Sequence, residues 1–225
     1  MNYKEITLNF RNVDGLKNYV ASQLHSLFPM HGLAQDIEAV NLYVPRALER
    51  MRPILSAVRA FKADEFNHFN SLQYATFLYL LANEMWRTDK SNCLIADRLF
   101  CLNRALSGMD LFYAVEMPEI FFISHGIGSV IGNATYGNRF AFFQNVTVGR
   151  VGDFRPKIGE NAILYPGVTI TGEANIGNNV VISAGIFLHN IEVPDDTVVI
   201  SEDGQINFKN RKRNYSDLYF DNCFY

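Results

Sequence analysis

An aliphatic side chain recurs at every sixth position between residues 158 and 188 of the chain. The members of this series are Ile158, Leu164, Ile170, Ile176, Ile182 and Leu188. An α-helix would repeat such positions every 3.6 residues and a half-buried strand every second residue, so neither element accounts for the spacing. A chain that turns a corner every six residues does, because each aliphatic side chain then points to the axis of a three-sided prism. The series therefore predicts a parallel β-helix.

A second series, of small or branched side chains, lies two residues before the repeated position. Its members are Ala162, Val168, Ala174, Val180 and Ile186. Read towards the N-terminus, the six-residue rhythm continues through Val148, Phe142 and Tyr136, and residues 149–157 interrupt it. A nine-residue insertion of this kind has to leave the prism as a loop, which is a common place for function. Asn and Gly at the expected corners, as in Gly177-Asn178-Asn179, suit the left-handed conformations that tight corners require.

Residues before position 110 show helical spacing of apolar side chains instead of this repeat. The expected helices run from Asp14 to about Phe28, over Leu33–Met51, over Leu72–Trp86, and from an N-cap at Ser91 to Gly108. Glycine and β-branched residues dominate from Asp110 to about Ile200, and a polar, then aromatic stretch follows. The sequence predicts an α+β protein: an α-helical domain over 1–110, a β-helix over 111–200, and a C-terminal tail over 201–225 that packs on the body or on a neighbour.

Composition describes a globular protein without the basic face that nucleic-acid binding requires. Of the 225 residues, 48% are hydrophobic and 19% are charged, and the formal net charge is −3. The longest apolar stretch, around Leu111–Ile131, is interrupted by Glu116, Glu119 and His125, so we expect no membrane span. The cysteines, which lack metal-ligand spacing, are Cys93, Cys101 and Cys223. Reduced thiols and an N-terminus without a signal-peptide pattern favour a soluble cytoplasmic protein without a metal.

The flat faces of a short β-helix would be exposed in a single chain. Three prisms side by side would cover them, so a homotrimer is expected. The alternative is a monomeric prism with the helices folded over it. The sequence leaves open whether trimers pair further through the helices.

His125 is the histidine with the most suggestive surroundings, a glycine-rich bend early in the prism. Glu116 stands nine residues earlier, and a neighbouring carboxylate would orient the imidazole and stabilise its protonated form, as a general base requires. In a coil of about eighteen residues, nine is half a turn, so spacing alone does not bring the two together. The alternative is that His125 is solvated or structurally satisfied. The structural interpretation is preferred for His189, which has no obvious partner.

Three motifs that follow one another along the chain resemble those of serine O-acetyltransferases. They read Phe122-Ile-Ser-His-Gly-Ile-Gly-Ser-Val-Ile-Gly, Phe143-Gln-Asn-Val-Thr-Val-Gly and Gly152-Asp-Phe-Arg-Pro-Lys-Ile-Gly. In that family the same succession is His-x-x-Gly, Gln-x-Val-Thr-Leu-Gly and Asp-Arg-His-Pro-Lys-Ile-Gly. The similarity covers about residues 110–195, and the helical region before it also suits the family. The resemblance implies a trimeric left-handed β-helix with acetyl-CoA as cosubstrate.

The resemblance also implies roles for individual residues. His125 would remove the proton from an acceptor hydroxyl, which then attacks the thioester carbonyl. Glu116 matches the family's aspartate partner if one hexapeptide has been lost between the pair. Coenzyme A in this family lies in the groove between adjacent prisms, held largely by backbone groups where small residues let it approach. By position this implicates Gly149, Pro166, Gly167, Ala184 and Gly185.

A basic cluster near the C-terminus is a further candidate for cofactor contact. It contains Lys209, Arg211, Lys212 and Arg213. These cations could meet the 3′-phosphate of coenzyme A. A solvated tail is the preferred interpretation.

Departures from the family concern the acceptor. Ser124 replaces the aspartate that precedes the base, and Phe154-Arg155 replaces Arg-His before Pro-Lys. Those family residues help to hold the carboxylate and the amine of serine. The run Leu-Phe-Tyr-x-Val-Glu also resembles proteins of bacterial polysaccharide clusters. Residues expected to line the acceptor end are Ser124, Gln144, Asp153 and Arg155.

The sequence thus predicts an acetyl-CoA-dependent O-acetyltransferase with a small-molecule acceptor, and it slightly favours a hydroxyl of a sugar or saccharide precursor. The alternative is a serine O-acetyltransferase of cysteine biosynthesis. A second alternative, from another class, is a non-catalytic trimeric scaffold.

Overall fold

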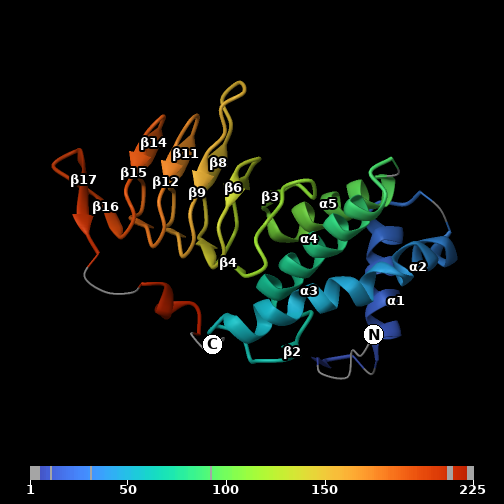
Figure 1. Cartoon of the computed structure of the whole chain (residues 1–225). Coiled ribbons are helices and arrows are strands. Elements are labelled where there is room, and N and C mark those ends of the chain that lie inside the picture. The colour runs from blue at the N-terminus through green and yellow to red at the C-terminus, as the bar shows by residue number, and fades with distance from the viewer. Residues whose placement is uncertain (1–5, 11, 31, 92, 212–214, 222–225) are drawn as a thin grey trace. The chain divides into compact units, whose positions relative to one another are not determined.

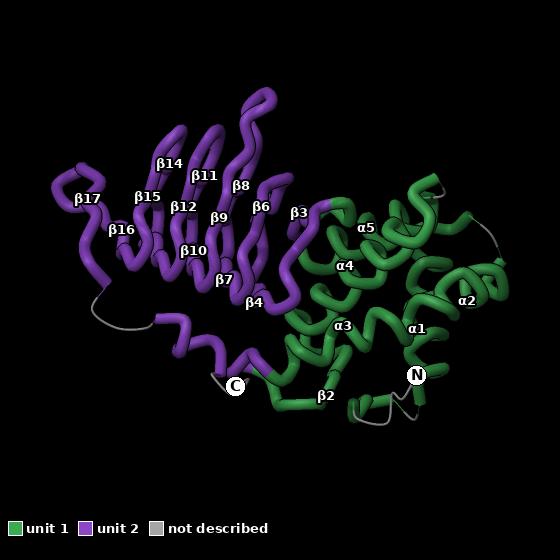
Figure 2. The backbone as a smooth tube through the Cα atoms, viewed as in Figure 1, with its two compact units in different colours: residues 1–56, 61–107, 112–114 green, residues 57–60, 108–111, 115–225 purple. Residues whose placement is uncertain are grey.

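The structure, a computed structural model, describes residues 6–10, 12–30, 32–91, 93–211 and 215–221. The chain divides into two compact units, coloured separately in Figure 2. The helical unit comprises residues 1–56, 61–107 and 112–114. The prism unit comprises residues 57–60, 108–111 and 115–225.

The helical unit is built around one helix that is buried on every side. Its helices are α1 (Val13–Leu27), α2 (Leu33–Asn41), α3 (Tyr43–Ala57), α4 (Ser71–Thr88) and α5 (Leu94–Ser107). Two short strands, β1 (Thr7–Leu8) and β2 (Glu65–Phe66), pair in parallel. Every residue of α4 from Gln73 to Asn83 is buried, as expected of a helix at the centre of a unit.

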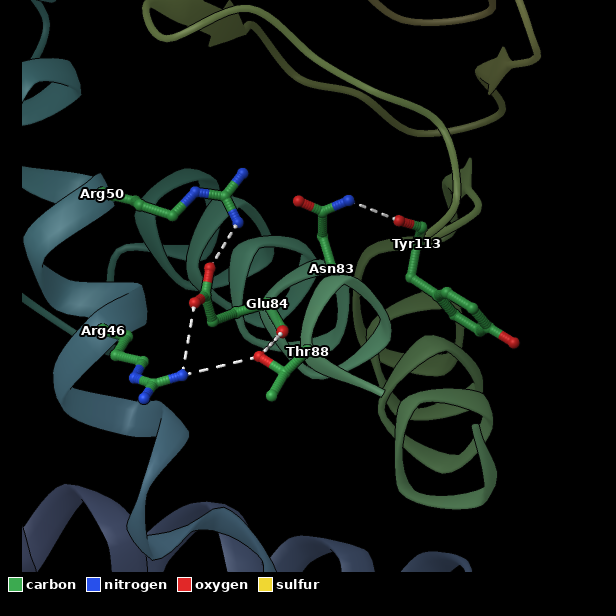
Figure 3. A network of polar contacts seen from close by, with 6 residues as sticks. All are labelled: Arg46, Arg50, Asn83, Glu84, Thr88 and Tyr113. Carbon is green, nitrogen blue, oxygen red and sulfur yellow. Dashed lines mark hydrogen bonds and ion pairs between the residues drawn. The ribbon is translucent and has the colours of Figure 1, made fainter. Parts of the chain in front are cut away.

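Polar side chains connect α4 to its neighbours, as Figure 3 shows. The guanidinium groups of Arg46 and Arg50 on α3 reach the Glu84 carboxylate, with the Arg50 Nη1 to Glu84 Oε2 distance at 3.2 Å. Asn83 Nδ2 donates to the backbone carbonyl of Tyr113 at 2.6 Å. Burial lowers the pKa of Arg50. The central helix is therefore held by specific polar contacts as well as by apolar packing.

The N-caps of two helices differ from those expected. α1 is capped by Asn12, whose side chain accepts a hydrogen bond from the Gly15 amide at 3.0 Å, so Asp14 lies inside the first turn. The Ser91 hydroxyl donates to Asp89 at 2.6 Å instead of capping α5. At α1 two residues of capping type, Asn12 and Asp14, lie close together, and the sequence does not show which one takes the role.

One expected helix is two helices, because the segment Leu33–Met51 breaks at Leu42 into α2 and α3. The end of α5 agrees with expectation. Gly108 follows it with a φ of +65°, the left-handed conformation in which helices commonly end.

In the part of the chain that the structure describes, the prism unit consists of three sheets (Figure 1), which are named after the strands β7, β8 and β9 (labelled in Figure 2). The β7 sheet contains β4 (Phe121–Ile123), β7 (Phe140–Phe142), β10 (Ile163–Leu164), β13 (Val181–Ile182), β16 (Thr197–Glu202) and β17 (Gln205–Asn210). The β8 sheet contains β3 (Asp110–Leu111), β5 (Val130–Ile131), β8 (Thr147–Gly149), β11 (Thr169–Thr171) and β14 (Phe187–His189). The β9 sheet contains β6 (Thr135–Tyr136), β9 (Lys157–Ile158), β12 (Asn175–Ile176) and β15 (Glu192–Val193). All pairings are parallel except that of β16 with β17.

The repeat predicted from the sequence is the register of these sheets. Ile158 pairs with Ile176, Leu164 with Ile182, and Ile170 with Leu188, each eighteen positions on. All six of these side chains are at most 3% exposed. Identical positions of successive coils therefore stack into three aliphatic columns, and the β-helix prediction is confirmed.

The insertion after Val148 is shorter than expected. β8 continues to Gly149 and β9 begins at Lys157, so the loop is residues 150–156 rather than nine residues. Within it Val151 and Phe154 form an antiparallel bridge around Gly152, whose φ is +60°. Gly149 and Lys157, the two ends of the interruption, belong to the strands β8 and β9. The six-residue spacing alone could not show this.

The C-terminal segment contains a short 3-10 helix, η2 (Ser216–Leu218), and packs on the prism unit. Cys223 lies outside the described residues. No helix among the described residues is long and apolar enough to cross a membrane.

Candidate active site

The β7 sheet passes into the β8 sheet through a column of stacked corners. These corners are residues 124–129, 143–146, 165–168 and 183–186, together called the His125 edge. Each corner donates a backbone hydrogen bond to the one before it at 2.9–3.0 Å, from Asn145 to Ile127, from Gly167 to Gln144 and from Gly185 to Pro166. Since neighbouring strands lie about 4.8 Å apart, the first and last corners are separated by about 14 Å.

This column brings together seven residues that the sequence implicates separately, the first of which is Ser124. The others are His125, Gln144, Pro166, Gly167, Ala184 and Gly185. The corner-to-corner hydrogen bonds fix their order along the edge. A candidate base therefore stands at one end of a line of candidate cofactor contacts.

His125 occupies a strained corner and is exposed. Its φ is +59°, a left-handed conformation that costs a non-glycine residue about 1–2 kcal/mol. Ser124 before it is buried, and the Ser124 amide donates to the Phe142 carbonyl at 2.8 Å. A Cβ on Gly126 would lie 2.7 Å from Cγ2 of buried Ile123, so the next position requires glycine. The corner thus presents the imidazole to solvent from a rigid backbone.

Ser129 ties this corner to the next one and was not among the residues expected at the site. It is 1% exposed, its hydroxyl donates to the Phe143 carbonyl at 2.8 Å, and it accepts from the Val146 amide at 3.1 Å. A small hydroxyl side chain between Gly128 and Val130, where the repeat expects an apolar residue, is the only sequence signal for this role.

Gln144 carries an unsatisfied acceptor. Its Oε1 atom is buried and has no hydrogen-bond partner among the described residues. A buried acceptor without a donor costs about 1–3 kcal/mol. The second corner of the edge therefore holds a polar group that the single chain does not satisfy.

The remaining residues expected at the acceptor end lie elsewhere. Asp153 and Arg155 are exposed on the loop 150–156, which follows Gly149 at the corner between the β8 and β9 sheets. Glu116 is exposed on the segment between β3 and β4. Within one chain, the structure therefore places Asp153, Arg155 and Gly149 across the β8 sheet from the His125 edge.

Three of the glycines that the sequence implicates in cofactor binding have room around them: Gly167 and Gly185 on the His125 edge, and Gly149 across the β8 sheet. A Cβ on Gly149 or Gly185 would meet nothing within 4 Å, and one on Gly167 would lie 3.7 Å from Gly185. At Gly159, by contrast, a Cβ would lie 2.6 Å from the backbone of Gly177, so packing requires that glycine. The exposed backbone at the corners fits a ligand that is held mainly by main-chain groups.

The described members of the basic cluster face other partners. Lys209 pairs with Glu202 at 3.0 Å, and Arg211 Nη1 donates to the Asn179 carbonyl at 2.9 Å, at the corner between the β9 and β7 sheets. Lys212 and Arg213 lie outside the described residues. Among the described residues there is no group of three or more His, Cys, Asp or Glu side chains that could hold a metal ion.

Sequence comparisons find serine acetyltransferases. No family model matches the sequence. Serine acetyltransferase of Bacillus licheniformis is 28% identical over 151 residues, covering 64% of this chain and 68% of that protein. Serine acetyltransferase 2 of Arabidopsis thaliana is 34% identical over 131 residues, covering 56% of this chain and 40% of that protein.

Solved structures show the same fold. Serine acetyltransferase of Neisseria gonorrhoeae superposes with a TM-score of 0.66 at 19% identity, covering 93% of this chain and 84% of that chain. A structure of that protein in complex with serine has a TM-score of 0.64 at 20% identity, covering 88% and 84%. A serine acetyltransferase in complex with CoA has a TM-score of 0.67 at 20% identity, covering 88% and 86%.

These likenesses confirm the predicted fold class, a helical region followed by a left-handed parallel β-helix. Sequence relatives and structural neighbours together support a place for the chain in a serine O-acetyltransferase-like family of hexapeptide-repeat acyltransferases.

Proposed function

We propose that the chain is an acetyl-CoA-dependent O-acetyltransferase with His125 as its general base and serine as its acceptor. The observation that carries the proposal is the His125 edge, where an exposed imidazole and open glycine corners form one line. The motif departures favour a saccharide acceptor, but the relatives reported above are named serine acetyltransferases, and this favours serine.

The chemistry follows from the position of the imidazole. His125 accepts the proton of the acceptor hydroxyl as the oxygen attacks the thioester carbonyl carbon. The tetrahedral intermediate then expels the coenzyme A sulfur, which takes the proton from the imidazolium. The products are an acetyl ester and free coenzyme A. The rigid corner contributes by holding the base in one orientation, which reduces the entropy lost in the reaction.

A homotrimer would complete the site. Exposed apolar side chains lie on the β8 sheet and on the loop beside it: Val130, Val151, Phe154 and Phe187, each at least 43% exposed. A neighbouring prism packed against this face would cover them. The loop carrying Asp153 and Arg155 would then reach the His125 edge of the neighbour, uniting residues that a single chain keeps apart.

The test is release of coenzyme A thiol from acetyl-CoA with serine, simple sugars and nucleotide sugars as acceptors. Serine should give acceptor-dependent release, and His125→Ala should lower kcat by at least about a hundredfold with cofactor binding retained. His189→Ala, in the same prism, is the control and should keep full activity. Unchanged turnover in His125→Ala would show that His125 is not the general base. A chain that releases no thiol with any acceptor would instead support the non-catalytic trimeric scaffold.

A saccharide hydroxyl is the second candidate acceptor. Two observations favour it: the position before the base is a buried, uncharged Ser124, and Phe154 exposes an aromatic ring where the family has a cation. Both remove charged partners of an amino acid. Thiol release with a sugar and none with serine would reverse the order of the two candidates.

A further inference from the structure

The outer face of the β7 sheet is apolar and buried, unlike the outer face of the β9 sheet. Phe122, Ala141, Ile163 and Val181 occupy successive strands in register and are at most 4% exposed. The matching positions of the β9 sheet are polar and exposed, at Thr135, Lys157, Asn175 and Glu192. The β7 sheet therefore has a covering layer that the repeat itself does not supply.

Residues 215–221 contribute to that layer and are called the C-terminal brace. The brace pairs with residues 57–60: the Arg59 amide donates to the Tyr219 carbonyl at 2.9 Å, and the Asp221 amide donates to the Ala57 carbonyl at 2.8 Å. The Arg59 guanidinium adds bonds of 2.6 Å to the Asp221 carboxylate and to the Asp217 carbonyl. A segment fixed by four such contacts is a defined part of the fold.

Tyr219 is the residue of the brace that reaches the His125 edge. Its hydroxyl lies 2.9 Å from the hydroxyl of Tyr165, and its ring centroid lies 5.5 Å from that of Phe143 and 6.1 Å from that of Phe122. The rings of Phe143 and Tyr165 also stack, at 5.1 Å. One ring from the C-terminal brace therefore contacts residues of three successive coils: Phe122 in β4, and Phe143 and Tyr165 directly after β7 and β10.

Each of these three partners stands at the entrance to a corner of the His125 edge. Phe122 comes two residues before the corner of His125, Phe143 opens the corner of Gln144, and Tyr165 opens the corner of Pro166. Burial and the hydrogen bond with Tyr165 raise the pKa of the Tyr219 hydroxyl, which favours its neutral form. Movement of Tyr219 would remove its contacts with the residues that lead into the first three corners. Of the contacts described above between those corners, only the backbone hydrogen bonds, Ser129 and the stacked rings of Phe143 and Tyr165 would then be left.

We infer that Tyr219 is a positioning residue, which holds the corner of His125 in line with the cofactor corners. This inference rests on the proposed function. It assigns the C-terminal brace a role in turnover, although the brace contains none of the residues that would touch the substrates. The strained φ of His125 makes the corner sensitive to such support, because a strained conformation persists only where its surroundings fix it.

The test compares Tyr219→Ala with Tyr215→Ala. Both residues belong to the brace, but the ring of Tyr215 lies under the Arg211 guanidinium, whose Cζ is 5.9 Å from the ring centroid. Tyr219→Ala should lower kcat by at least about tenfold with little change in KM for acetyl-CoA, while Tyr215→Ala keeps kcat within about twofold. Equal kcat values in the two folded variants would overturn the inference.

A milder pair keeps the experiment informative if Tyr219→Ala does not fold. Tyr219→Phe and Tyr165→Phe each remove one hydroxyl of the same hydrogen bond and should each lower kcat by about fivefold. The double variant should be no worse than either single one, because both remove the same interaction. Additive losses would overturn the positioning role of the pair.

Hydrogen exchange separates this inference from the proposed function. Amides of residues 121–131 should exchange faster in Tyr219→Ala than in Tyr215→Ala, whether or not the chain acetylates serine. Thiol release that is absent in the wild-type chain would refute the proposed function alone. Unchanged protection of residues 121–131 would refute the support of the His125 corner.

Discussion

The two units of the chain bury different kinds of side chain. The prism unit stacks aliphatic residues in columns, and the polar residues that are buried as a whole in its described part carry small hydroxyls: Ser124, Ser129, Thr197 and Ser216. The helical unit buries charged, imidazole and amide groups as well: Asp36, His68, Gln73, Asn83, Arg98 and Asn103. Each coil of the prism repeats the contacts of the one before it. The helical unit depends on pairs that occur once, and such pairs leave no period in the sequence.

The largest effect should come from the ion pair buried in the helical unit. Arg98 binds both carboxylate oxygens of Asp36, at 2.5 and 3.0 Å, and its Nε donates to the Phe28 carbonyl at 2.8 Å. Arg98→Met removes the guanidinium that binds the buried Asp36 carboxylate and leaves that carboxylate beside the His25 ring, with Nδ1 3.6 Å from Oδ2, which should lower the free energy of unfolding by about 3–5 kcal/mol. Fluorescence of Trp86, the only tryptophan of the chain and part of α4, reports the transition of this unit.

A double variant separates the charge from the packing. Arg98→Met with Asp36→Leu should recover much of the loss, since no buried charge remains. Hydrogen exchange of the prism strands should not change in either variant. Faster exchange in the prism would show that the two units do not unfold separately, and the comparison between them would fail.

The next effect should come from a prism column. Leu164 is fully buried between Phe142 and Ile182 in successive coils. Leu164→Ala should cost about 3 kcal/mol, by lost transfer energy and by a cavity that neighbouring coils cannot close. Far-UV circular dichroism of the strands should show the loss while the Trp86 transition stays in place. Glu192→Ala, on the exposed face of the β9 sheet, is the control and should change neither signal.

This difference between the units explains what the sequence could predict. Ile158 stacks on Ile176, and Ile170 on Leu188, because eighteen residues of chain make one coil of the prism. The regular spacing in the sequence therefore predicts the contacts in the fold. The Arg98–Asp36 pair joins residues that are 62 positions apart, and no local pattern indicates it. The helices were predicted from periodicity, but their caps at Asn12 and Asn70 depend on the local backbone.

The candidate site divides in the same way. The repeat and the motifs implicate His125, Gln144 and Gly185, and the stacking of coils then aligns them. Tyr219 could not be found like this, because it reaches the edge from the C-terminus, 54 positions after Tyr165. Glu116, Asp153 and Arg155 stay predictions, since their place at the site depends on a neighbouring chain or on contacts that spacing does not fix.

A comparison of two glycines of the prism unit tests whether Gly185 contacts the cofactor. Gly185 lies on the His125 edge, whereas Gly204 lies in the turn between β16 and β17. Gly185 and Gly204 have φ values of +73° and +76°, and a Cβ on either would meet nothing within 4 Å. Alanine at either position should therefore cost a similar 1–2 kcal/mol, approximately, from left-handed strain. Only Gly185→Ala should also raise KM for acetyl-CoA, by about tenfold or 1.4 kcal/mol. Equal KM values for acetyl-CoA in the two variants would show that Gly185 does not contact the cofactor.

The smallest effect concerns pH and only the helical unit. His68 Nδ1 lies 2.7 Å from the Asn9 side-chain oxygen, and its ring stacks on Phe10 with centroids 4.0 Å apart. Because Asn9 Oδ1 accepts this bond, the Nδ1 atom carries a proton in the neutral ring. Burial lowers the pKa of His68 below its usual 6.5. The folded unit therefore keeps a neutral imidazole at a pH where the unfolded chain already binds a proton.

The sign of the pH effect follows from this difference. The contribution of His68 is complete above about pH 6.5 and is lost as the pH falls through the lowered pKa of the folded state, by at most about 1.4 kcal/mol per pH unit. His68→Asn keeps a donor near the Nδ1 position and cannot titrate. Urea unfolding followed by Trp86 fluorescence at pH 7.5 and 5.5 should show a larger loss for the wild-type chain than for this variant. Because other titrating groups are common to both chains, the difference isolates His68, and equal losses would mean that its imidazole is protonated as readily in the fold as in the unfolded chain.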